Sequence, residues 1–163
     1  MTETTPDPTD NFVVKLVTNP VSTWLIRKIS APLDPIIFRA TNGKWSTMGP
    51  SGDTMVTITM KGRNTGQERS VHLTSVRHKG DLLLVASAMG AEKHPAWRYN
   101  LEANPDVEVQ VKGERYRGRA QVLSDEEKAE VWDMMRKQVP MIHVYEKRTD
   151  RNIRVFRISR ADA

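Results

Sequence analysis

The chain of 163 residues contains no cysteine, so it has no disulfide, thiolate nucleophile or cysteine-ligated metal. This absence fits a reducing compartment, and we expect a cytoplasmic protein. Aromatic residues are scarce, at 6%, and are not interleaved with the basic residues, which argues against a nucleic-acid-binding surface. No run reaches the roughly 18 apolar residues of a membrane span. The first ten residues also lack the basic and apolar regions of a secretory signal.

Motifs for self-contained catalysis are missing too. The sequence has no phosphate-binding P-loop, no GxGxxG after a strand, no HExxH and no GxSxG. The four histidines are scattered, and we expect surface or structural roles and no metal for His72, His78, His94 and His143. Any reaction is therefore expected to depend on an organic cofactor.

Basic residues are in moderate excess, with 25 Lys and Arg against 20 Asp and Glu, a net charge of +5. Such an excess fits either an ordinary solvated surface or an anionic partner. Lys61, Arg63 and Arg69 bracket a glycine-containing turn, and a second group of cations lies between Lys147 and Arg160. Charge gathered at a turn indicates a small anionic ligand more than a nucleic acid.

The pattern predicts three regions. Residues 1–10 have the composition of a disordered tail, and residues 11–35 form an N-terminal helical segment. In that segment Val21, Trp24, Leu25 and Ile29 recur at helical spacing, and prolines 32 and 35 are expected to end the helix. The apolar stripe either caps the core, or makes a basic amphipathic helix that touches a membrane or forms an entrance lid.

Residues 36–163 are predicted to be one α+β domain around a barrel-like sheet. After a loop over 41–53, the strands are expected at 55–60, 69–77, 82–86, 107–111, 115–123 and 153–158. Residues 94–103 form a short helix, and Ser124 with Glu127 marks the start of another that Pro140 ends. A short segment over 141–147 leads to the last strand.

Two segments are candidates for a binding site. The first is the turn from Lys61 to Arg69, where Gly62 and Gly66 allow close approach and the arginines offer forked donors to a phosphate. A hairpin with glycine and arginine also occurs without any ligand. The second segment runs from Val85 to Gly90 and on to Asn100. Small residues at a strand end leave room for a flat ring, but Trp97 is equally compatible with the core.

These segments carry a resemblance to a known family. In order, GRNTGQER with VHL, LLLVASAMGAEKHPAWRYNLEANPDVEVQV, SDEEKAEVW and VYEKRTDRNIRVF resemble the motifs of the deazaflavin-dependent nitroreductase-like family, over roughly residues 36 to 158. The chain departs from the family pattern in three places: His72 replaces a common proline, Arg154 stands where Ile-Pro is usual, and Asn64-Thr65 replaces a Lys-Ser pair.

The resemblance implies a split β-barrel of the FMN-binding type with peripheral helices. It implies the cofactor coenzyme F-420, an 8-hydroxy-5-deazaflavin with a phosphate and an acidic tail. On this basis the phosphate and tail contact Lys61, Arg63, Asn64, Thr65 and Arg69. The deazaflavin ring contacts Ala86, Ser87, Ala88, Met89, Lys93, Pro95, Trp97 and Asn100.

The family's activity implies hydride transfer to a quinone, nitro-aromatic or activated enone. Tyr145, Ser87 and Trp97 are the candidates to stabilise charge on the acceptor oxygen, with Tyr145 the first choice and His143 a weaker one. Two alternatives stay open: a non-catalytic deazaflavin carrier, and an FMN-dependent reductase on the same fold. We expect a small-molecule partner, no nucleic acid, and either a monomer or a homodimer.

Overall fold

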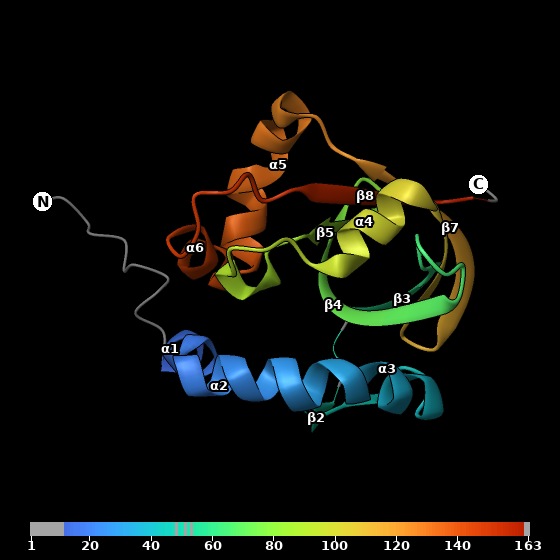
Figure 1. The fold of residues 1–163 in the computed structure, drawn as a ribbon, viewed down its shortest axis with the longest axis horizontal. Helices are drawn as coiled ribbons and strands as arrows, with labels where there is room; N and C mark the ends of the chain where they lie inside the picture. Colours follow the sequence, from blue (N-terminus) through green and yellow to red (C-terminus); the bar gives the residue numbers. More distant parts are fainter. Residues whose placement is uncertain (1–11, 48, 51, 53, 162–163) are drawn as a thin grey trace, which may run out of the picture.

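Six antiparallel strands close into a barrel in the order β3-β4-β5-β8-β7-β6 (Figure 1). The computed structural model describes residues 12–161 except 48, 51 and 53, so the predicted tail at 1–10 lies outside the described residues. The predicted barrel is confirmed, and each of the six predicted strands is present. Their bounds are Met55–Lys61 (β3), Glu68–His78 (β4), Asp81–Val85 (β5), Asp106–Val111 (β6), Glu114–Val122 (β7) and Val155–Arg160 (β8).

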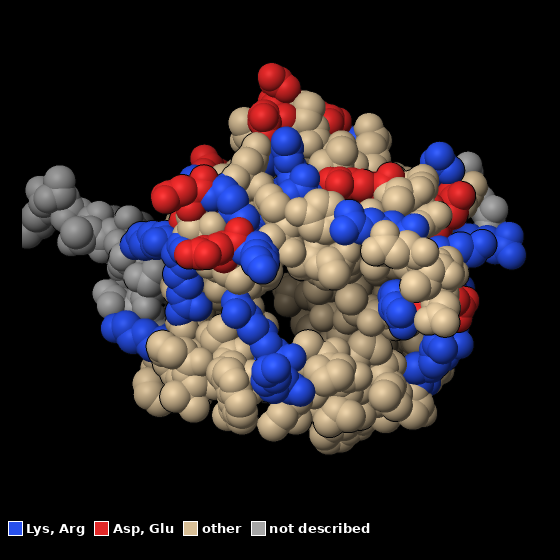
Figure 2. Space-filling view, in the orientation of Figure 1, with Lys and Arg blue, Asp and Glu red and all other residues tan. Residues whose placement is uncertain are grey.

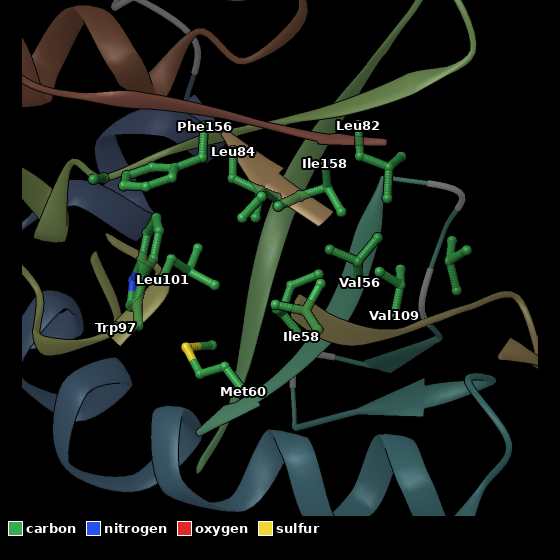
Figure 3. Packing of buried hydrophobic residues seen from close by; sticks show 14 residues of the cluster. Val56, Ile58, Met60, Leu82, Leu84, Trp97, Leu101, Val109, Phe156 and Ile158 are labelled. Carbon is green, nitrogen blue, oxygen red and sulfur yellow. The ribbon is translucent and has the colours of Figure 1, made fainter. Parts of the chain in front are cut away.

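The barrel interior is filled by the apolar side chains that alternate with outward-facing residues along the strands. Figure 3 shows Val56, Ile58 and Met60 of β3 pointing toward Leu82 and Leu84 of β5. All five side chains are buried, and burial of each is worth about 1.5–3 kcal/mol. The period-two pattern of β3 therefore decides which of its faces lies inside, and leaves Thr57 and Thr59 on the outer face.

β5 is buried on both faces, as its continuous apolar run predicts. Leu83 points away from the barrel interior into a second cluster with Val76, Val131 and Met135. That cluster lies beneath α5 (Asp125–Gln138) and α6 (Met141–Glu146). The Ser124 hydroxyl accepts from the Glu127 amide at 3.1 Å and the Glu127 carboxylate accepts from the Ser124 amide at 2.9 Å, so the predicted capping box is confirmed.

The N-terminal helices form a separate layer along one side of the barrel (Figure 1). They are α1 (Phe12–Thr18), α2 (Pro20–Leu25), the π-helix η2 (Ile26–Ser30) and α3 (Ala31–Ala40). The prediction that Pro32 and Pro35 end the helix is wrong. At the end of η2 the Ala31 amide reaches back to the Ile26 carbonyl, so the hydrogen-bond ladder has shifted before it meets Pro32, and the helix continues to Ala40.

This layer has its apolar side chains on the outside. Val21, Trp24, Leu25 and Ile29 are all exposed, so the interpretation that this stripe caps the core is wrong. The face turned inward carries Thr23, Ser30 and Asp34, with Phe38 as its fully buried apolar contact. Beneath it lie polar residues of the outer barrel face, including Thr57, Thr59, His72 and Gln110. The layer therefore packs on the barrel through these polar groups together with the buried side chains of Val14, Pro35 and Phe38.

The loop after α3 contains a two-stranded element that its composition did not indicate. β1 (Trp45–Ser46) pairs with β2 (Gly49–Pro50) in antiparallel fashion. The amide of Thr47 donates to the Asp34 carboxylate at 2.6 Å, which ties this element to α3.

Candidate functional site

A cleft of about 520 Å³ lies between the β3–β4 hairpin and α4 (Ala96–Ala103). One side comes from the hairpin turn and the first residues of β4, and the other from α4 and the residue that leads into it. The lining residues are Gly62, Arg63, Asn64, Thr65, Arg69, Ser70, Val71, His94, Ala96, Trp97, Tyr99 and Asn100. The two candidate segments of the sequence thus face each other across one space.

The hairpin turn is fixed by its own backbone. The Gly62 amide donates to the Gln67 carbonyl at 2.8 Å, and the Gly66 amide donates to the Gly62 carbonyl at 2.8 Å. Gly66 has φ +66°, in the left-handed region that glycine adopts without strain. This tight geometry leaves Arg63 and Arg69 exposed on either side of the turn.

α4 fixes the turn from the opposite side. The Asn100 side-chain oxygen accepts from the Arg63 amide at 3.1 Å, and the Arg63 guanidinium lies 4.7 Å from the centre of the Tyr99 ring. Trp97 is buried and its ring packs edge-on against Phe156, with 5.6 Å between centroids. Trp97 is therefore both a core residue and a wall of the cleft, which joins the two interpretations that the sequence left open.

The cleft is cationic. Its lining, within the part of the chain that the structure describes, contains two arginines and no carboxylate. Arg69 donates to the Gln67 side chain at 3.2 Å, and among the described residues neither Arg63 nor Arg69 forms an ion pair. Both guanidiniums are thus available to an anionic ligand.

The backbone from Ala86 to Ala91 lies beside the cleft and is held by arginines. The Arg151 guanidinium donates to the Ala86 carbonyl at 3.0 Å and also contacts the His94 ring Nδ1 at 3.1 Å. Because His94 lines the cleft, Arg151 connects this strand end to the cleft wall. Burial, with the charges of Arg98 and Arg151 next, lowers the pKa of His94, which favours its neutral form at pH 7.

Tyr145 lies on the other side of this segment, on α6. It is buried, its hydroxyl contacts the Met141 sulfur at 3.8 Å, and its carbonyl oxygen closely approaches Gly90. Burial raises the pKa of Tyr145, against the lesser opposing effect of Arg148 and Arg27, so the hydroxyl keeps its proton at neutral pH. The Ser87 hydroxyl makes no hydrogen bond with any described residue, while the Ser87 carbonyl accepts from Arg151.

The structure brings together part of the predicted set. Six predicted residues line the cleft: Arg63, Asn64, Thr65, Arg69, Trp97 and Asn100. Eight others do not line it: Lys61, Ala86, Ser87, Ala88, Met89, Lys93, Pro95 and Tyr145. Of these, Ala86 is fully buried in the barrel core and Lys61 is exposed on the far end of β3.

Several lining residues were not predicted, including Ser70, Val71 and Tyr99. Val71 belongs to the inward pattern of β4, so the alternation of this strand contains a weak signal for it. Tyr99 follows Trp97 on α4, so the helical periodicity contains a weak signal for Tyr99.

The face drawn in Figure 2 is hollowed between the N-terminal layer and the rest of the molecule, with Lys and Arg side chains at its rim. No group of described residues could hold a metal ion, and no described helix is long and apolar enough to cross a membrane.

Comparison with known proteins identifies the family to which the chain belongs. The family model described as F420H(2)-dependent quinone reductase matches residues 34–159. A protein of Mycobacterium tuberculosis with the name F420H(2)-dependent quinone reductase is 32% identical over 146 residues, which cover 86% of this chain and 98% of that protein.

Solved structures agree with this. One titled "Structure of F420-H2 Dependent Reductase (FDR-A)" is 34% identical with a TM-score of 0.60, covering 65% of this chain and 94% of its own. Another, described as a domain-swapped dimer, is 31% identical with a TM-score of 0.63, covering 79% of this chain and 100% of its own. The chain belongs to the F420H(2)-dependent quinone reductase family, and is an oxidoreductase whose cofactor is coenzyme F-420.

Proposed function

We propose that the cleft binds reduced coenzyme F-420 and that the acceptor is a quinone-class molecule held beside the Ala86–Ala91 segment. The observation that carries this proposal is the make-up of the cleft, which has arginines at the hairpin turn and an apolar, aromatic wall at Val71, Ala96 and Trp97. A deazaflavin with a phosphate and an acidic tail needs one cationic end and one flat apolar end. The residues therefore fit the cofactor.

The hairpin turn suits the phosphate and the acidic tail. Arg63 and Arg69 have forked donors, no carboxylate stands among the described residues of the lining, and charge-assisted bonds of this kind are worth about 1.5–3 kcal/mol each. Asn64 and Thr65 add polar groups at the same turn, and Lys61 adds positive charge at the exposed end of β3.

The flat end suits the ring. Trp97 provides the wall, and Asn100 holds the turn against α4 through the Arg63 amide. In our proposal Ala86, Ser87, Ala88 and Met89 line the ring mainly through their backbone, while Lys93 and Pro95 complete the entrance. When bound in reduced form, the cofactor supplies a hydride from its C5 position.

The protein's own task is to hold the acceptor and to stabilise the charge that develops on its oxygen. Ser87 and Tyr145 are the proposed donors. Among the described residues the Ser87 hydroxyl has no competing bond, and the hydroxyl of Tyr145 has only its weak contact with the Met141 sulfur. Either hydroxyl can therefore turn to a quinone oxygen at little cost in lost hydrogen bonds.

Turnover with a soluble naphthoquinone tests this proposal. The rate at which reduced coenzyme is oxidised is expected to fall by about a hundredfold or more in Ser87→Ala or Tyr145→Phe, with coenzyme affinity unchanged, because one donor is worth about 2.7–4 kcal/mol in such sites. Arg119→Ala, which removes an exposed ion pair with Asp106 elsewhere on the barrel, is the matched control. Tight coenzyme binding without turnover of any quinone would favour the non-catalytic carrier.

We also propose that the N-terminal layer contacts an anionic membrane surface, so that a cytoplasmic protein can reach a lipid-soluble acceptor. Phe12, Trp24 and Ile36 are among ten large apolar side chains that this layer and the adjoining strand expose. Residues 12–47 hold five basic residues and one acidic residue, Asp34, which is buried. An apolar stripe with cations beside it is typical of helices that lie in a membrane interface.

Sedimentation with vesicles tests the membrane contact. The protein is expected to bind vesicles that contain phosphatidylglycerol more tightly than vesicles of phosphatidylcholine alone, and Trp24→Ser with Ile36→Ser is expected to abolish binding. Val122→Ser, at an exposed apolar position of β7, is the control. A homodimer that covers the same stripe is the alternative, and light scattering that shows a dimer in which this stripe is protected would replace the membrane proposal.

A further inference from the structure

Three consecutive residues beside the cleft have left-handed backbone. Ala88, Met89 and Gly90 have φ of 47°, 56° and 76°. Left-handed conformation costs a residue with a side chain about 1–2 kcal/mol, so two such residues in a row need external support. The support is expected to come from the groups that bind the carbonyls of this segment.

Arg151 provides most of it. Its Nε donates to the Ala91 carbonyl at 2.8 Å, one terminal nitrogen donates to the Ala86 carbonyl at 3.0 Å, and the other donates to the Ser87 carbonyl. The first terminal nitrogen also lies 3.1 Å from the His94 Nδ1. Because a guanidinium has only donors, that Nδ1 accepts, and the ring proton of neutral His94 stays on Nε2.

Two further arginines bind the carbonyls between these. Arg27 of η2 donates to the Ala88 carbonyl at 2.7 Å, and Arg148 donates to the Met89 carbonyl at 3.3 Å and to the Thr18 carbonyl at the end of α1. Five carbonyls of the segment are thus each bound by a guanidinium. The same contacts link the segment to the N-terminal layer.

We propose that Arg151 is a positioning residue for hydride transfer, because it fixes the Ala86–Ala91 backbone and the orientation of His94 at the cleft wall. This inference rests on the proposed function, in which that backbone lines the deazaflavin ring. Arg151 acts through the segment and through His94. A small displacement of the segment would move the ring relative to the acceptor, and a misplacement of about 1 Å can lower a rate by about a hundredfold.

The experiment compares Arg151→Ala and Arg151→Lys with Arg154→Ala as the matched control. Arg154 lies three residues away, and its guanidinium binds Asp125. With the coenzyme saturating, Arg151→Ala is expected to lower kcat for a naphthoquinone by about tenfold or more, while KM for the quinone changes less. Arg151→Lys is expected to recover little, because one ammonium cannot reproduce a fork that reaches four acceptors.

A second readout needs neither coenzyme nor turnover. Hydrogen exchange of the amides from Ser87 to Ala91 is expected to become faster in Arg151→Ala and to stay unchanged in Arg154→Ala. Unchanged kcat in Arg151→Ala, or full recovery by Arg151→Lys, would overturn the positioning role. If the wild type binds no coenzyme, the proposed function fails, and the exchange rates still decide whether Arg151 holds the segment. If Arg151→Ala does not fold, Arg151→Lys decides.

Discussion

Arg63 and Arg69 are the residues on which cofactor affinity is expected to depend most. Both are exposed at the hairpin turn and neither is neutralised by a described carboxylate, so substitution removes charge without disturbing a buried network. Arg63→Ala or Arg69→Ala is expected to weaken coenzyme binding by about tenfold, the equivalent of one charge-assisted hydrogen bond. Isothermal titration with coenzyme F-420 measures this, with Arg119→Ala as the control. Equal affinity in all four proteins would contradict the assignment of the turn.

Asn64 offers the opposite test, since it stands where the family pattern has lysine. Asn64→Lys adds a third cation to the lining of the cleft and is expected to tighten coenzyme binding several-fold at low salt, with a smaller gain at high salt because exposed charges are screened. The same titration at two ionic strengths checks both parts. A gain that salt does not reduce would mean that the new side chain acts by some means other than charge.

At this scale the sequence predicted the chemistry of the turn but not Arg151. The hairpin residues are neighbours in the chain, so their pattern is visible locally. Arg151 meets its acceptors more than fifty residues away, at Ala86 and His94, and only folding brings them together. The cluster of cations between Lys147 and Arg160 was the available signal, and it did not distinguish Arg151 from arginines that form surface ion pairs.

Among the elements, the short η3 helix (Ala88–Gly90) and α6 meet at Gly90. A Cβ on Gly90 would lie 2.6 Å from the Arg148 Cβ and 2.9 Å from the Tyr145 carbonyl oxygen, at a φ of +76°. Gly90→Ala is therefore expected to lower the free energy of unfolding by about 1–2 kcal/mol because of the left-handed backbone, and by roughly 1–3 kcal/mol more because of the steric clash. Gly80→Ala, with φ +90° and open space around it, is the control for the backbone share alone. Chemical denaturation measures both, and equal losses would contradict the close packing.

His72 makes the contact between β4 and α3 sensitive to pH. Its ring lies 4.5 Å from the Phe38 ring, and burial lowers its pKa below 6.5 despite the opposing charge of Asp34. As the pH falls, the His72 ring is protonated in the unfolded chain before it is protonated in the folded protein. The contribution of neutral His72 to the free energy of unfolding is therefore complete above about pH 6.5, and it is lost as the pH falls toward the lower pKa of the folded state. Melting temperatures at about pH 7.5 and about pH 5.5 are expected to differ less in His72→Gln than in the wild type. The same difference in both would exclude His72 as a source.

The elements also show why some predictions held and others did not. Barrel strands such as β3 and β5 were predictable because alternation and continuous apolar runs directly reflect which faces are buried. The end of the N-terminal helix was not, because the proline rule assumes a regular ladder and η2 shifts it. Whether the apolar stripe around Trp24 faces the barrel or the solvent was also not predictable. Helical periodicity shows that these side chains share one face of the helix, but it does not show what that face contacts.

In the whole molecule, the segment that Arg27, Arg148 and Arg151 hold connects the cationic cleft to the outward apolar layer. We propose that the cleft between the β3–β4 hairpin and α4 is the deazaflavin site. Trp97 is a wall of that cleft, so its fluorescence should report occupancy directly.

The most direct test is a titration of the purified protein with coenzyme F-420, read by tryptophan fluorescence, with flavin mononucleotide in parallel. We expect saturable quenching by the deazaflavin, a smaller response in Trp97→Phe, and weaker binding in the double variant Arg63→Ala with Arg69→Ala. Binding of flavin mononucleotide alone, or deazaflavin binding that is unaffected by the arginine substitutions, would contradict the account.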